Sequence, residues 1–179
     1  MAIQIYILGK LMQDNNYPYK LKKELSEPIP LDQLGGVTES KLYYHFESLV
    51  KQGLIEPVEI IKEEHRPDKQ VFAITEKGKA ALPQKIYHIF ENTDTISGMV
   101  IALANIEYVD REKVIKILEK KITLLKERWN NIKNLENQVK LTEEKEHLVN
   151  YLGEYFSDKT DHTSHWLGEL ISRIKRNEI

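Results

Sequence analysis

Cysteine is absent from this sequence of 179 residues. Without thiols, the chain cannot form disulfides, thiolate zinc sites or a cysteine nucleophile, and nothing in it indicates an oxidising compartment. Long apolar runs are also missing, because the first one, "IQIYILG", ends at Lys10 and no other approaches the roughly 18 residues that span a membrane. We therefore expect a cytoplasmic protein with no membrane partner.

A strong excess of charge of either sign is the next feature that the sequence lacks. There are 26 basic and 28 acidic residues, which gives a net charge of -2. Domains that bind nucleic acid are often strongly basic, so this total does not by itself indicate a polyanionic partner. Any argument for nucleic-acid binding has to depend on where the charges lie. With 41% hydrophobic residues the chain is nonetheless expected to fold around one core or two small ones.

Motifs of catalysis and metal binding are scarce. The sequence contains no phosphate-binding loop, nucleophile elbow or His-Glu-x-x-His motif. One segment, "DKTDHTSH", brings together Asp158, Asp161, His162 and His165, and histidine with carboxylate can bind zinc. Capping and turn formation at the start of the last helix is the interpretation that we favour for it. We expect no enzyme activity, no metal and no cofactor.

Three short helices are predicted in the first third of the chain. Apolar residues recur at helical spacing over residues 3–12, and a second helix opens near Pro18, whose fixed φ suits a first turn. After a loop rich in proline and glycine, a third helix is predicted from Thr38, a plausible N-cap, to Gly53, a C-terminal stop.

A β-hairpin is predicted next, followed by helices only. The β-rich runs "PVEIIKE" and "QVFAIT" are separated by a segment whose Pro-Asp pair suits a turn. Beyond about residue 82 no segment has a convincing strand pattern. The predicted fold class is mainly α with a small β-hairpin. Its element order, three helices and then a hairpin, is that of a winged helix-turn-helix.

Several segments carry a further resemblance. Over roughly residues 3–82 the sequence resembles the PadR family of bacterial transcriptional regulators in "ILGKLM", "YPYKLKKEL", "SKLYYHFESLVKQGLIE" and "RPDKQVFAITEKGKAAL". The C-terminal motif "HWLGELISRIK" is similar to the closing helix of the longer members. The resemblance implies a DNA-binding winged helix over residues 1–82 and a helical dimerisation domain over residues 83–179.

The third helix has two contrasting faces when each residue advances by about 100°. An arc that suits the core holds Leu42, Phe46, Leu49 and Val50. The opposite arc can donate hydrogen bonds to phosphates and to base edges in a major groove, and it consists of Ser40, Lys41, Tyr44, Ser48 and Lys51, with Tyr43 and His45 on its flanks. We interpret this outer face as a DNA-recognition surface. The alternative is an ordinary solvated face.

The hairpin tip is the second candidate for DNA contact. Lys62, His65, Arg66 and Lys69 cluster around the predicted turn, and an arginine there can enter a narrow minor groove. Acidic residues lie among them, so the alternative is an ordinary polar loop. From this segment we include Lys62, Arg66 and Lys69 in the predicted DNA-binding set.

The C-terminal half contains an apolar seam typical of helices that pack side by side. From about Asp110 a helix of some 30 residues is predicted, with a seam made of Ile115, Leu118, Ile122, Leu125, Trp129 and Ile132. A second amphipathic helix carries Trp166, Leu167, Leu170, Ile171 and Ile174. An intramolecular core is the alternative for this seam. Because few partners within the chain match its length, we predict a homodimer in which Trp166 and Leu170 also take part.

Together these features predict a sequence-specific DNA-binding transcriptional regulator. The resemblance implies a homodimeric repressor on an inverted-repeat operator, relieved in some members by a hydrophobic or phenolic small molecule. An aromatic pocket between the domains would draw on Tyr6, Tyr17, Tyr19, Tyr87, Phe90, Met99, Tyr108 and Trp129. Two other functions remain open: a winged-helix module that binds another protein, and a small-molecule-binding helical protein with a vestigial DNA domain.

Overall fold

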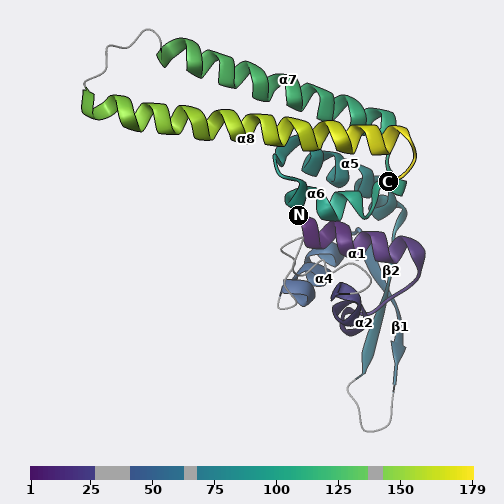
Figure 1. Ribbon diagram of the computed structural model, residues 1–179. Helices are drawn as coiled ribbons and strands as arrows, with labels where there is room; N and C mark the ends of the chain where they lie inside the picture. Colours follow the sequence, from purple (N-terminus) through teal and green to yellow (C-terminus); the bar gives the residue numbers. More distant parts are fainter. Residues whose placement is uncertain (27–40, 63–67, 137–142) are drawn as a thin grey trace. The chain divides into compact units, whose positions relative to one another are not determined.

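The computed structural model describes residues 1–26, 41–62, 68–136 and 143–179 (Figure 1). The chain divides into two compact units, Met1–Asp110 and Arg111–Ile179. The described residues are mainly helical and contain one sheet of two strands, so the predicted fold class is confirmed. In this part of the chain no helix is both long and apolar enough to cross a membrane.

Helix α1 (Ala2–Gln13) is the centre of the first unit. Ile5, Ile7 and Leu8 are completely buried, because α1 packs against α4, α5, α6 and β2. Close packing extends to Gly9, where an added Cβ would meet the side-chain oxygen of the buried Asn105. The Asn105 side-chain amide donates to the Ile101 carbonyl oxygen at 2.8 Å.

Helix α2 (Pro18–Lys23) begins at its proline, as predicted, and continues into a short 3-10 turn, η1 (Glu24–Ser26). The Tyr6 hydroxyl of α1 donates to the Leu21 carbonyl oxygen at 2.7 Å and ties the two helices together. Just before α2, Asn16 pairs with Phe72 of β2 as an antiparallel bridge, with N–O distances of 2.8 and 3.1 Å. The start of α2 is thereby attached to the hairpin.

Helix α4 (Leu42–Lys51) corresponds to the predicted third helix. Its predicted N-cap, Thr38, lies outside the described residues. Its predicted stop is confirmed, because Gly53 has a φ of +68°, which favours glycine. Gly53 donates to the Val50 carbonyl at 2.8 Å and Leu54 to the Leu49 carbonyl at 3.0 Å, the hydrogen-bond pattern of a Schellman motif.

The hairpin consists of β1 (Ile55–Ile61) and β2 (Lys69–Ile74), paired antiparallel with Ile55 opposite Ile74 and Ile61 opposite Lys69. The register shifts between Pro57 and Glu59. The predicted Pro-Asp turn falls at the edge of residues 63–67, which lie outside the described part of the chain.

Two helices complete the first unit: α5 (Glu76–Asn92) and α6 (Ile96–Leu103), followed by the 3-10 turn η3 (Ile106–Tyr108). Both α5 and α6 pack on α1, and they bury Leu82, Phe90 and Met99. The compact unit therefore continues to Asp110. A functional division at residues 82 and 83 stays a prediction.

The second unit consists of α7 (Arg111–Glu136) and α8 (Glu143–Lys175), which lie side by side and antiparallel (Figure 1). The Lys175 ammonium is 3.1 Å from the Glu119 carboxylate and links the two helices. Helix α8 runs through residues 158–165, so the predicted capping role of "DKTDHTSH" at a helix start is wrong. The histidines and aspartates of this segment lie in the middle of α8. The described residues contain no cluster of three or more potential metal ligands.

Candidate nucleic-acid interface

The outer face of α4 presents long polar side chains to solvent. Tyr44 is 68% exposed and Tyr43 is 51% exposed, and the side chains of Lys41 and Lys51 are exposed as well. The opposite face is buried through three of its four predicted members, Leu42, Phe46 and Leu49. The fourth, Val50, is half-buried. A helix held by one apolar face and open on the other can lie in a major groove without losing its own packing.

Ser48 and His45 are less available for contact with DNA than their positions around the helix predict. Ser48 is half-buried, and its hydroxyl and carbonyl oxygens both accept hydrogen bonds from the Gln52 side chain at 3.0 Å. His45 is also half-buried, and its Nδ1 has no hydrogen-bond partner within the described residues. Burial lowers the pKa of His45 below its ordinary value, and the chain's amino terminus and Lys41 lower that pKa further. The lowered pKa favours the neutral form of the imidazole.

The C-terminal end of α4 is anchored by α5, which sequence reasoning missed. The Thr75 hydroxyl donates to the Gly53 carbonyl at 2.8 Å and accepts from the Gly78 amide at 3.0 Å, so one side chain caps α5 and holds the end of α4. The Lys77 ammonium donates to the Gln52 carbonyl at 2.7 Å. An added Cβ at Gly78 would meet the Leu54 carbonyl oxygen. The signal in the sequence was the N-cap "TEKG" directly after the second strand.

The hairpin carries the remaining predicted contacts. Lys62 is exposed just after β1, and Lys69 is half-buried at the start of β2. The Lys69 ammonium lies 5.4 Å from the centre of the Tyr17 ring. Arg66, like Ser40 before α4, lies outside the described residues, so both stay predictions.

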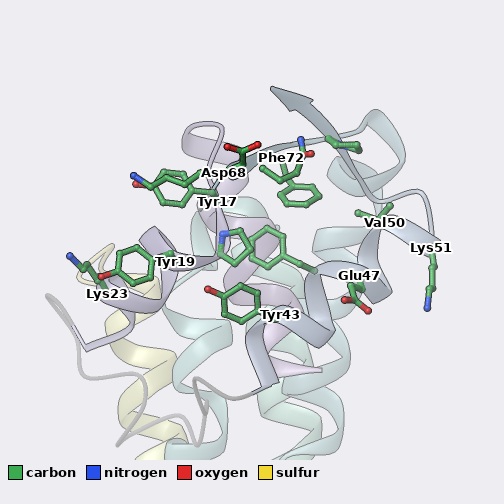
Figure 2. Close-up of a pocket in the computed structure, with 14 residues that line it drawn as sticks. Tyr17, Tyr19, Lys23, Tyr43, Glu47, Val50, Lys51, Asp68 and Phe72 are labelled. Carbon is green, nitrogen blue, oxygen red and sulfur yellow. The ribbon is translucent and has the colours of Figure 1, made fainter. Parts of the chain in front are cut away.

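A cavity of about 1010 Å³ lies between α2, α4 and the hairpin. Its aromatic walls come from Tyr17 just before α2, Tyr19 of α2, Tyr43 of α4 and Phe72 of β2 (Figure 2). Phe46 of α4 also lines it. Phe46 and Phe72 also contact each other, with ring centres 5.1 Å apart.

The aromatic residues of the predicted pocket are thus largely separated. Only Tyr17 and Tyr19 line this cavity, which belongs to the first unit alone. Four of the others are buried core residues, namely Tyr6, Tyr87, Phe90 and Met99. Tyr108 and Trp129 are half-buried on η3 and α7. Core packing of the first unit thus takes up four of the eight residues that were predicted to form the pocket.

The predicted dimerisation residues also differ in exposure. Ile115, Leu118 and Leu170 are buried within the single chain, and Ile122, Leu125 and Trp129 are half-buried. Ile132 and Trp166 are each 47% exposed. The argument from helix length does not hold, because α8 gives α7 a partner of similar length within the chain.

An apolar face on α8 was missed by the sequence reasoning. Its exposed members are Leu148, Tyr151, Leu152, Tyr155 and Phe156. Their spacing of three and four residues was the available signal. They extend the set of candidates for a contact between protomers.

A known protein family matches part of the chain. Residues 7–84 match the family described as "Transcriptional regulator PadR-like family". No curated protein matches the sequence.

Three solved structures illustrate the similarity. Bacillus subtilis PadR in complex with operator DNA is 15% identical, with a TM-score of 0.46, over 97% of this chain and 99% of that one. The same protein in complex with p-coumaric acid is 16% identical, with a TM-score of 0.40, over 98% and 99%. A transcriptional regulator from Clostridium thermocellum is 27% identical, with a TM-score of 0.40, over 48% and 79%.

The matched residues run from α1 through the outer face of α4 and the hairpin to the first half of α5. They contain the whole of the candidate interface described above. Over residues 7–84, this chain is similar to the PadR-like family of transcriptional regulators.

Proposed function

We propose that this protein is a cytoplasmic repressor without enzyme activity, which binds an inverted-repeat operator as a homodimer through α4 and the hairpin. The observation that carries the proposal is the outer face of α4, where Lys41, Tyr44 and Lys51 are exposed opposite a buried apolar stripe. Ammonium groups and a phenol on one face of a helix suit contacts with phosphates and with base acceptors.

The hairpin adds a second contact beside α4. Lys62 and Lys69 flank its tip, and with Arg66 they would contact the phosphates or the minor groove next to the helix. The bridge between Asn16 and Phe72 ties the hairpin to the start of α2, so the distance between the hairpin and the helices stays fixed when they contact the duplex.

Dimerisation is supported by the exposed apolar face of α8. Tyr151 is 66% exposed and Tyr155 is 50% exposed on the same side of the helix. Large apolar side chains grouped on one surface commonly mark a contact with another protein. Two copies on one duplex also compensate for the modest charge of a single domain, because linked modules gain an effective-concentration advantage.

The experiment is a gel shift with the DNA that flanks the protein's own gene, in the presence of excess nonspecific competitor. We expect a specific complex for the wild type and none for the Lys41→Ala, Tyr44→Ala double variant. Both side chains point away from the core, so circular dichroism should show that the variant is folded. Equal binding by the two proteins would contradict the assignment of α4, and a module that docks only onto other proteins would give no complex at all.

A further inference from the structure

Glu47 is the only acidic residue of α4, and it lies among side chains that are predicted to contact DNA. Tyr43 and Tyr44 precede it by four and three residues, and Lys51 follows it by four. Side chains at these spacings are neighbours on the surface of a helix, so the carboxylate has two phenols on one side and an ammonium on the other. Figure 2 shows Glu47 between Tyr43 and Lys51. The predicted recognition surface therefore contains one negative charge in its midst.

The carboxylate of Glu47 takes no part in holding the fold together. Its side chain is exposed, and among the residues that the structure describes it forms no hydrogen bond and no ion pair. The preceding residue, Phe46, is buried against Phe72 of β2, with ring centres 5.1 Å apart. The core thus fixes the position of Glu47 on the helix surface while its carboxylate stays available for a partner outside the chain.

The chemistry of a carboxylate restricts what that partner can be on DNA. The phosphates repel it, and an ionised carboxylate can only accept hydrogen bonds. In the major groove guanine and thymine present acceptors, whereas adenine and cytosine present an amino group. The amino group of adenine lies beside its N7 acceptor, which would repel the carboxylate, but cytosine presents its N4 amino group alone. Cytosine is therefore the base that suits Glu47.

We propose that Glu47 is a specificity-determining residue, which reads one C·G base pair in each half of the operator by accepting a hydrogen bond from the N4 amino group of cytosine. This inference rests on the proposed function, since it requires α4 to lie in the major groove. The ammonium groups of Lys51 and Lys69, which line the same cavity as Glu47, offset its repulsion by the phosphates. Specificity then comes partly from exclusion, because guanine or thymine at that position leaves a desolvated carboxylate without a donor.

Selection of binding sites from random duplex DNA tests the readout with the full-length protein. Glu47→Ala removes the acceptor, and Glu47→Gln replaces it with an amide, which suits adenine. Glu127→Gln is the control, because it removes the same charge from an exposed position on α7. We expect the wild type and the control to select one C·G position in each half-site. At that position Glu47→Ala should show no preference and Glu47→Gln should prefer A·T, while the other positions stay unchanged.

The contact atom is tested on the selected operator. N4-methylcytosine keeps its base pair but loses the N–H that points into the major groove. In place of the identified cytosine it should weaken binding of the wild type by about five- to 150-fold and leave binding of Glu47→Ala unchanged, as measured by fluorescence anisotropy. Circular dichroism checks that both variants of Glu47 are folded.

Two results would overturn the inference. If Glu47→Ala binds all sequences more tightly and its selected sequence is unchanged, the carboxylate only repels phosphates. If N4-methylcytosine weakens the wild type and Glu47→Ala equally, Glu47 does not contact that amino group. Failure of the proposed function is distinguishable from both, because the wild type would then select no sequence at all.

Discussion

Substituting alanine for glycine is expected to have opposite effects at two positions. At Gly78, in the first turn of α5, the added methyl group would meet the backbone carbonyl oxygen of Leu54. That carbonyl accepts a hydrogen bond from the Thr75 amide at 3.1 Å, so the backbone cannot move away without disturbing the junction of α4 and α5. At Gly168, within α8, the added group meets no atom within 4 Å apart from its chain neighbours and the adjacent backbone of its own helix.

The magnitudes follow from these surroundings. Overpacking lowers the free energy of unfolding by roughly 1–3 kcal/mol, and we expect Gly78→Ala near the upper end because the atom it meets belongs to the backbone. The higher helix propensity of alanine offsets at most about 1 kcal/mol of this loss. A net loss of about 2 kcal/mol lowers the Tm by roughly 8 °C for a unit of this size. Gly168→Ala retains only the propensity gain, about 0.5–1 kcal/mol of added stability.

The assay is thermal and urea unfolding followed by far-ultraviolet circular dichroism. Fluorescence adds a second probe, because the only two tryptophans, Trp129 and Trp166, both belong to the second unit. Gly78→Ala should also weaken DNA binding, since it displaces the anchored end of α4. If Gly78→Ala is as stable as the wild type, or if both substitutions have the same sign, the close approach of α5 to the end of α4 is refuted.

Three further predictions concern single features. The pKa of His45 is lowered in the folded state, so its protonation favours unfolding. Stability should therefore be highest above the ordinary histidine pKa of about 6.5 and should fall as the pH drops below it. Urea unfolding measured above and below pH 6.5 should show a smaller fall in stability for His45→Gln. Tyr6→Phe removes a buried hydrogen bond to the Leu21 carbonyl and should cost about 1–2 kcal/mol in urea unfolding, whereas an unchanged midpoint would mean that the bond contributes nothing. Introducing two charges with Tyr151→Asp and Tyr155→Asp should convert dimers to monomers in light scattering without unfolding α8, and a persisting dimer would place the interface elsewhere.

Local patterns predicted the first unit well. The period of the apolar residues gave α1 and the buried stripe of α4, and Gly53 marked the end of α4 because its positive φ is a local property of the backbone. The hairpin followed from two β-rich runs. Each of these patterns is local, because it is formed by residues of the same helix, turn or strand that it predicts.

Features that depend on distant residues were not predictable in the same way. The aromatic cavity forms because residues 16 and 72 are paired, which brings α2 to the hairpin, and no pattern within either segment indicates that pairing. The continuity of α8 through "DKTDHTSH" was missed for another reason. Aspartate, threonine and serine favour caps and turns, but here the packing of α7 and α8 overrides that preference over the whole helix.

The salt dependence of operator binding tests the central claim most directly. If Lys41, Lys51, Arg66 and Lys69 each meet a phosphate in both protomers, about eight contacts form, and the logarithm of the affinity should fall with the logarithm of salt concentration with a slope near roughly -7. Replacing both Lys41 and Lys51 with alanine removes about four contacts and should flatten the slope by between three and four units. Lys116→Ala, an exposed lysine on α7, is the control and should leave the slope unchanged. A shallow slope for the wild type, measured by fluorescence anisotropy, would contradict DNA binding through α4 and the hairpin.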